Sequence, residues 1–172
     1  MEMREKIQNP LIYPSLSADM GAKAFIRTMS NIENIKLLKA RYCRFLDQQM
    51  WDDFVELFTP GCMFAVEVKD PAQWSIFRKE GSNPEPISRD LWIAMVSRTM
   101  ADGGMSAHHV HSPEISFVDD SNAIGFWALE DHLLTPAMKF HGWGRYEHRL
   151  IRIGSAWKIA AWRLRWMHIE AI

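Results

Sequence analysis

Hydrophobic residues in the first third of the chain recur at helical spacing. Ranges 17–29 and 51–58 predict short helices, and between them Asn31 can cap the clearest helix of the chain. Within that helix the apolar positions follow one another by three or four residues, so they form one stripe that a core would bury. The stripe consists of Ile32, Ile35, Leu38, Tyr42, Phe45 and Leu46.

The second half of the chain has the pattern of strands. Strands are predicted at 62–68, 106–118, 122–134, 138–153 and 156–169, with turns at Asp120–Asn122, Thr135–Pro136 and Gly154–Ser155. Range 69–87 carries four Pro or Gly residues and predicts a long loop, and Ser88 can cap a helix over 88–100. Helices followed by a run of antiparallel strands indicate an α+β fold. We expect an N-terminal arm over 1–16 and a single domain over 17–172.

Both faces of the strand at 122–134 are apolar, since Ile124 and Phe126 alternate with Trp127 and Leu129. A sheet with one face in water would alternate hydrophobic and polar residues instead. We therefore expect one face to pack on the helices around a pocket. The other face is expected to pack on a second copy, giving a trimer or dimer.

Composition narrows the class of protein. A net charge of -1 from 20 basic and 21 acidic residues argues against a nucleic-acid surface. No apolar run approaches a membrane span, and residues 1–10 lack the apolar stretch of a secretory signal, so we expect a cytoplasmic protein without membrane contact. Cys43 and Cys62 are predicted to be small core residues.

Histidines are concentrated at one point of the sequence. All seven follow residue 107, and three of them lie in the run 108–111. His108 has small or apolar neighbours and is the leading candidate for a general base, because imidazole titrates near neutral pH. A carboxylate on its other ring nitrogen would fix the tautomer and stabilise the imidazolium. The alternative is a structural histidine that is hydrogen-bonded in the core.

Two residues of the long helix are candidates to lie beside that histidine. Asp47 falls at the margin of the apolar stripe, so it could be either a site carboxylate or a solvated helix-end residue. Tyr42 lies within the stripe. Its hydroxyl could bind a substrate oxygen, although core filling is the more common use of such a tyrosine.

Other charged residues in the predicted strands could have more than one role. His109 and His111 share the face opposite His108 and could bind a metal together with Glu130, His132 or His141, but we expect a polar surface there and no metal. Arg163 and Arg165 share one face of the last strand, where either a substrate anion or a subunit salt bridge would suit them. For the pair Glu130–Asp131 we expect structural ion pairing.

Three segments resemble the SnoaL-like branch of the nuclear transport factor 2-like superfamily. They are the stretch 39–60 with its Tyr42-to-Asp47 spacing, the histidine segment 108–115, and Gly125-Phe126-Trp127-Ala128-Leu129-Glu130-Asp131. Within the branch the bile acid 7α-dehydratases are the most similar. Scytalone dehydratases and hexachlorocyclohexane dehydrochlorinases are more distant.

The resemblance implies a cystatin-like cone, in which a curved antiparallel sheet wraps around N-terminal helices and encloses an apolar pocket. It implies an Asp–His dyad at Asp47 and His108, a substrate-polarising tyrosine at Tyr42, an arginine at Arg165, and no cofactor. Alternation places His108 opposite Ile115 and Phe117. If His108 faces the pocket, a bulge near Pro113 must reverse the alternation unless those two residues cover the outer face.

We therefore predict a cofactor-independent lyase of dehydratase type that acts on an apolar, ring-containing substrate. An isomerase that moves a double bond would need the same base. The alternatives without chemistry are a module that binds a hydrophobic ligand and a β-type structural subunit of a ring-hydroxylating dioxygenase. The residues expected to contact substrate are Trp127, Trp143, Phe126, Met100 and Val110.

Overall fold

The protein is described by a computed structural model over residues 21–69 and 85–172. The predicted arm at 1–16 and most of the predicted loop at 69–87 lie outside these residues. None of the helices in the described ranges is long and apolar enough to cross a membrane. Cys43 and Cys62 are both buried and unpaired with each other, as expected of core residues.

One long helix, α1 (Ala22–Asp47), replaces the two helices that the sequence predicted. Asn31 lies inside α1 rather than at a cap, and its Oδ1 accepts a hydrogen bond of 3.2 Å from Trp157 Nε1. Neither proline nor glycine interrupts residues 22–47, so this contact can hold asparagine in the helix interior despite its weak propensity. The apolar stripe of α1 is buried from Ile35 onward.

Two shorter helices complete the helical part. Helix α2 (Trp51–Val55) ends before the predicted Phe58, because Phe58 already pairs with the last strand. Helix α3 (Arg89–Met100) begins as predicted, with the Ser88 hydroxyl accepting a hydrogen bond of 3.3 Å from Leu91 N.

Six strands form one sheet in the order β2-β1-β6-β5-β4-β3. Their bounds are β1 (Phe58–Val68), β2 (Ile87–Ser88), β3 (Met105–Phe117), β4 (Asn122–Leu134), β5 (Lys139–Ile153) and β6 (Ala156–Ala171). The predicted strands are all present within a few residues. The sheet is mixed rather than fully antiparallel, because β1 runs parallel to β6.

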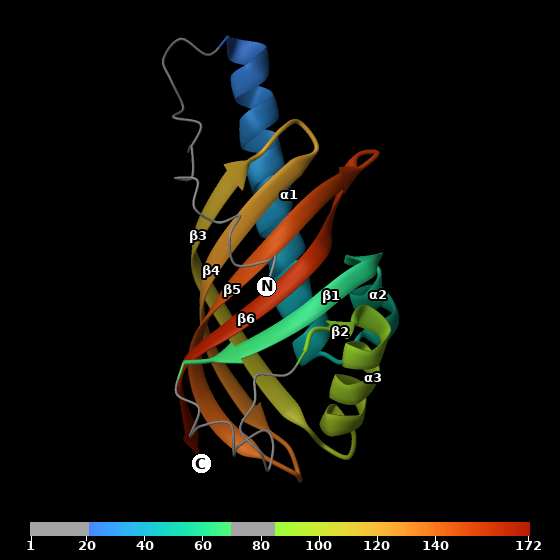
Figure 1. Ribbon diagram of the computed structural model, residues 1–172, viewed down its shortest axis with the longest axis vertical. Coiled ribbons are helices and arrows are strands. Elements are labelled where there is room, and N and C mark those ends of the chain that lie inside the picture. Colours follow the sequence, from blue (N-terminus) through green and yellow to red (C-terminus); the bar gives the residue numbers. More distant parts are fainter. Residues whose placement is uncertain (1–20, 70–84) are drawn as a thin grey trace.

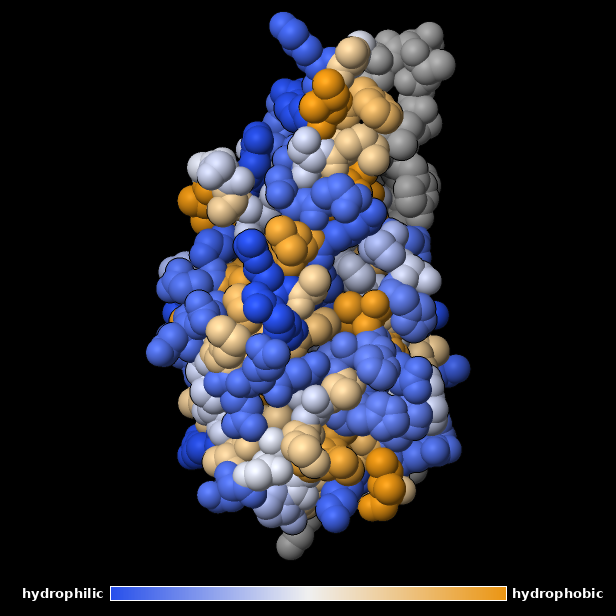
Figure 2. Space-filling model, turned by 180° about the vertical axis from the view of Figure 1, so that it is seen from behind, coloured by the Kyte–Doolittle hydropathy of each residue, from blue (hydrophilic) through white to orange (hydrophobic). Residues whose placement is uncertain are grey.

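The curved sheet wraps around α1, while α2 and α3 lie beside its β1–β2 edge (Figure 1). The N-terminal part of α1 extends past the sheet, which explains why the burial of its stripe starts only at Ile35. Seen from behind, the surface is mostly hydrophilic, with hydrophobic side chains in separate small groups (Figure 2). This is the predicted α+β cone, with the core between α1 and the inner face of the sheet.

A bulge in β3 reverses the side-chain alternation, which is one of the two arrangements that the sequence left open. The register with β4 shifts between His111 and Glu114, and Ser112 within the bulge has a left-handed φ of 51°. On one side of the bulge His108 lines a cavity. On the other side Ile115 packs against the core from the same inner face. One extra residue thus lets a polar group and an apolar anchor share one face.

Gly142 allows an indole to lie flat against the sheet. A Cβ at this position would sit 2.6 Å from the ring of Trp166, which is too close for any side chain. Trp166 in turn lines the cavity described below. The glycine therefore shapes the inner surface of the cone.

Candidate active site

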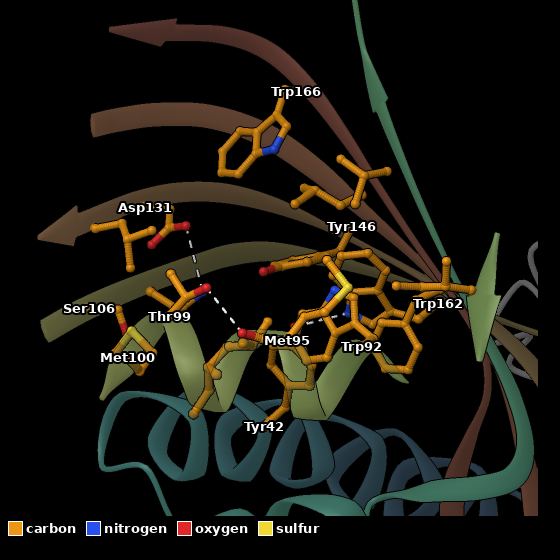
Figure 3. A pocket seen from close by; sticks show the side chains of 18 of the residues that line it. Tyr42, Trp92, Met95, Thr99, Met100, Ser106, Asp131, Tyr146, Trp162 and Trp166 are labelled. Carbon is orange, nitrogen blue, oxygen red and sulfur yellow. Dashed lines mark hydrogen bonds and ion pairs between the residues drawn. The ribbon is translucent and has the colours of Figure 1, made fainter. Parts of the chain in front are cut away.

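A cavity of about 270 Å³ lies between the helices and the inner face of the sheet. Tyr42 reaches it from α1, and residues of α3 such as Trp92 and Met95 stand on one side, with the sheet arching over them (Figure 3). The lining is mostly apolar and aromatic. Its polar members include Tyr42, Ser106, His108, Asp131, Tyr146, Thr99 and Glu85.

Asp47, the last residue of α1, meets the start of β3 and holds His108 in place. Its Oδ1 lies 2.6 Å from His108 Nδ1, its Oδ2 accepts from the His108 backbone N at 3.1 Å, and the Ser106 hydroxyl donates to Oδ1 at 2.7 Å. Because an ionised carboxylate only accepts hydrogen bonds, His108 carries a proton on Nδ1. Its Nε2 is therefore the nitrogen available for chemistry.

Opposing effects act on the pKa values of this pair. Burial by itself would raise the pKa of Asp47, but the hydrogen bond and charge of His108 and the hydrogen bond of Ser106 lower it overall. Burial would lower the pKa of His108, but the charges of Asp131 and Asp47 and the Asp47 hydrogen bond raise it overall. The carboxylate stays ionised, and the imidazole becomes a stronger base than free histidine.

Asp131 on β4 is a second carboxyl group beside the same imidazole. It pairs directly with His108 in the β3–β4 ladder, and its Oδ2 lies 3.6 Å from His108 Nε2. Its Oδ1 is buried and has no hydrogen-bond partner within the described residues. Burial raises the pKa of Asp131, so this carboxyl group takes up a proton more readily than an ordinary aspartate.

Two buried tyrosines, Tyr42 and Tyr146, present hydroxyl groups to the same region. Tyr42 Oη accepts a hydrogen bond of 3.0 Å from Trp162 Nε1 and is hydrogen-bonded to Tyr146. Its ring meets that of His108 edge-on at 6.5 Å between centroids. Burial raises the pKa of both tyrosines well above the ordinary value, so they remain protonated hydrogen-bond donors.

Helix α3 closes one side of the cavity with Trp92 and with the non-aromatic side chains of Met95, Val96, Thr99 and Met100. Trp92 stacks on Phe64 of β1 at 4.4 Å with an interplanar angle of 15°, and it also packs near Trp162. Planar apolar walls of this kind suit a ring-shaped ligand.

Four of the residues predicted for the site line the cavity or join it. Tyr42, His108 and Met100 line the cavity, and Asp47 holds His108 from behind. Trp127 and Val110 also belong to the inner side of the sheet, but neither lines the cavity: Trp127 is a core residue and Val110 packs against the core.

The other three predicted residues point to the outer face. Arg165 bonds Glu67 at 2.9 Å through its Nε, and its side chain is 55% exposed. Phe126 borders a hollow that includes Arg165, and Trp143 stacks on His168. The reason is alternation, because each of these residues neighbours an inward-facing one. These three residues therefore lie outside the cavity that His108 lines.

Sequence reasoning missed Asp131, Tyr146 and Ser106 as members of the site. Asp131 lies two and four positions after the inward-facing Leu129 and Trp127, so alternation along β4 would have placed it inside. We expected structural ion pairing because a charged pair in a strand more often has that role. Only the ladder pairing with His108 reveals its position in the site.

The structure is an α+β cone in which a partly buried carboxylate holds a histidine at the wall of an apolar cavity. The chain belongs to the family of SnoaL-like domains, which it matches over residues 27–163. The fold and the family predicted from sequence are therefore confirmed at this level.

Solved structures share this fold. A proposed scytalone dehydratase from Novosphingobium aromaticivorans has a TM-score of 0.67 at 15% identity, covering 86% of this chain and 91% of its own. A hexachlorocyclohexane dehydrochlorinase from Novosphingobium barchaimii has a TM-score of 0.64 at 10% identity, with coverage of 86% and 93%. The β subunit of a proposed aromatic-ring-hydroxylating dioxygenase from N. aromaticivorans has a TM-score of 0.64 at 12% identity, covering 82% of this chain and 92% of its own. Such low identities establish a common fold only.

Proposed function

We propose that this protein is a lyase that eliminates water or a similar small group from an apolar, ring-containing substrate. The observation that carries the proposal is the position of His108. Its Nδ1 lies 2.6 Å from Asp47, and its Nε2 lies 3.6 Å from Asp131 at the wall of an apolar cavity. A base and an acid side by side in a desolvated cavity are what an elimination needs.

In the proposed reaction, His108 Nε2 removes a proton from a carbon next to an activating carbonyl group. Asp47 stabilises the imidazolium that forms. The hydroxyl of Tyr42 or Tyr146 donates a hydrogen bond to the developing oxyanion. The C–O bond then breaks as protonated Asp131 gives its proton to the leaving oxygen. The imidazolium proton passes to Asp131, which restores both groups, and the products are an alkene and water.

The cavity suggests the class of substrate. Its aromatic and aliphatic walls favour an apolar ring system, with few polar groups to recognise. The resemblance of the sequence to bile acid 7α-dehydratases points in the same direction, and structural neighbours named as a dehydratase and a dehydrochlorinase support elimination as the reaction class. Arg165 has no part in this scheme, because its side chain lies on the outer face, where it pairs with Glu67.

The test is a panel of ring alcohols next to carbonyl groups, assayed for alkene formation. Once a substrate is found, Asp47→Asn and His108→Ala should each reduce kcat by at least about 10²-fold. His109→Ala is the matched control, because the His109 side chain points to the opposite face of β3 from His108. This substitution should leave turnover within about twofold of wild type. Circular dichroism would establish that the variants are folded. Full activity in both dyad variants would contradict the proposal.

An isomerase remains the alternative with the same base, and the outcome of the assay separates the two. Elimination releases water and adds a double bond, whereas isomerisation keeps the composition of the substrate. A binding module or a dioxygenase β-type subunit needs no proton transfer. Keeping His108 and Asp131 buried beside the partly buried Asp47 would then destabilise the fold without serving a reaction. Binding without turnover in wild type and His108→Ala alike would favour a module of that kind.

We also propose that copies of this chain assemble through the outer face of the sheet and that the protein is cytoplasmic. The outer hollow is lined by Phe126 and Met167 among charged residues such as Arg145 and Glu147, a mixture that suits a contact between subunits.

A further inference from the structure

A second group of ionisable residues lies on the outer face of the sheet. Glu130 and His132 on β4 and His141 on β5 each offer one donor atom, and these atoms lie within 4.8 Å of one another. His132 and His141 are direct partners in the β4–β5 ladder. Glu130 is two residues before His132 and therefore shares its face. We propose that these three side chains form a binding site for a zinc ion.

The distances fit a metal centre. His141 Nε2 lies 2.8 Å from Glu130 Oε1, and His132 Nε2 lies 3.8 Å from the same oxygen. A tetrahedral zinc ion with bonds of about 2.0–2.1 Å holds its donor atoms roughly 3.3 Å apart. The two observed distances lie on either side of this value. Small side-chain rotations would bring all three donors into the first coordination shell.

The two histidine rings lie face to face on adjacent strands. The imidazoles of His132 and His141 stack at 3.8 Å with an interplanar angle of 20°. On the other side of His141, the indole of Trp143 packs at 4.0 Å between centroids. Adjacent strands thus hold both Nε2 atoms within 3.8 Å of one carboxylate oxygen, and the rings would turn out of their stack to point both lone pairs at one ion. Donors that neighbouring strands already hold close together lose less entropy when an ion binds.

The donor set favours zinc over calcium or magnesium. Two imidazole nitrogens and one carboxylate suit a borderline transition ion, whereas calcium and magnesium take mainly oxygen ligands. The side chains of His141, Glu130 and His132 are 20%, 38% and 40% exposed, so an ion can enter from solvent and keep a water as fourth ligand. The set differs from the one that the sequence suggested, since neither His109 nor His111 belongs to it.

This site is separate from the cavity, although the two share a strand. Glu130 and His132 flank Asp131 on β4, but their side chains point to the opposite face. The backbone of the sheet lies between the outer donors and His108. A zinc measurement can therefore succeed or fail independently of the proposed lyase activity.

The test is calorimetric titration of the EDTA-treated, dialysed full chain with zinc chloride. We expect one ion per chain, and at least about tenfold weaker binding in His132→Ala, His141→Ala and Glu130→Gln. His111→Ala, an outer-face histidine outside the cluster, is the matched control. His108→Ala tests whether the cavity contributes, and both of these variants should bind zinc as the wild type does.

A second measurement needs no variant. Loading wild type with cobalt(II) should give the intense visible absorption of a tetrahedral centre, and X-ray absorption of the zinc form should show two imidazole ligands. Binding should also raise the melting temperature of wild type but not of His141→Ala. No stoichiometric binding to wild type, equal affinity in all three cluster variants, or loss of binding in His108→Ala would overturn the proposal.

Discussion

At the scale of single residues, Asp131 sets the protonation of the cavity. Its Oδ2 lies 3.6 Å from Nε2 of His108, and Oδ1 of Asp47 lies 2.6 Å from Nδ1. The imidazole therefore lies between two carboxyl groups. After burial, which lowers the pKa of His108, the charge of Asp131 is the largest influence and raises it. The strength of the proposed base therefore depends on a residue that sequence reasoning assigned to ion pairing.

Asp131→Asn should lower the pKa of His108. The amide keeps the shape of the side chain but removes the negative charge that stabilises the imidazolium whenever Asp131 is ionised. This variant also lacks the proposed acid, so its kcat should fall, while the acidic limb of the residual rate profile should move to lower pH because the neutral imidazole is the proposed base. The His108 Cε1–H chemical shift, followed by NMR against pH, measures this without a substrate.

Glu130→Gln is the matched control for that titration in metal-free protein. It removes the neighbouring carboxylate, which faces away from the cavity, and should leave the His108 titration close to wild type. An unchanged curve in Asp131→Asn would show that the two side chains do not interact.

At the scale of elements, the bulge in β3 decides which residues share the inner face. His108 precedes it and Ile115 and Phe117 follow it, and all three contact the interior. Without the extra residue, alternation would turn one group outward. The proposed site and the packing of the strand therefore depend on the same irregularity.

Deleting Ser112 should destabilise the protein by at least about 2 kcal/mol, because either Ile115 and Phe117 or His108 must leave the inner face. Ser112→Gly should instead be neutral or stabilising by up to about 1 kcal/mol. The left-handed φ of 51° is costly for a residue with a Cβ and free for glycine. Urea unfolding of the two variants beside wild type measures both effects. A deletion variant as stable as wild type would contradict this role of the bulge.

At the scale of the whole molecule, a lysine is enclosed where α1 meets the sheet. Lys39 is 2% exposed, its Nζ lies 2.9 Å from His148 Nε2, and the Tyr146 and Tyr42 rings are 3.2 and 3.9 Å away. The Nδ1 of His148 faces the Glu147 carbonyl at 3.1 Å, so its Nε2 accepts from the lysine. Burial lowers the pKa of Lys39 from 10.5 to about 7.

This pKa predicts how global stability depends on pH. Below about pH 7, Lys39 is protonated in both the folded and the unfolded chain. Between about 7 and 10.5, only the unfolded chain binds the proton, so the free energy of unfolding should rise with pH, by at most about 1.4 kcal/mol per unit. Lys39→Met should lose this rise between pH 7 and 9, as measured by urea unfolding.

Lys36→Met is the control, because Lys36 pairs with Glu33 at the surface and its side chain is 43% exposed. It should keep the pH dependence of wild type. Parallel stability curves for wild type and Lys39→Met would mean that the buried amine does not lose its proton in this range.

The sequence by itself determined the elements and the family. Apolar residues recur every 3.6 positions in a helix and every 2 positions in a strand, and both patterns are local. The stripe of α1, the Ser88 cap and the long strands could therefore be predicted directly from the sequence. Motif spacing also singled out Asp47, His108 and Tyr42. Local patterns could not show that α1 continues through Asn31, because the contact with Trp157 joins residues far apart in the chain.

Only the tertiary structure decided which side chains meet. Register and sheet order brought Asp131 to His108 and His132 to His141, and they placed Arg165, Phe126 and Trp143 outside. A shift of one residue in a strand exchanges its two faces, and such a shift depends on pairing with distant strands. The chemistry of each face is therefore a property of the assembled sheet rather than of any one segment.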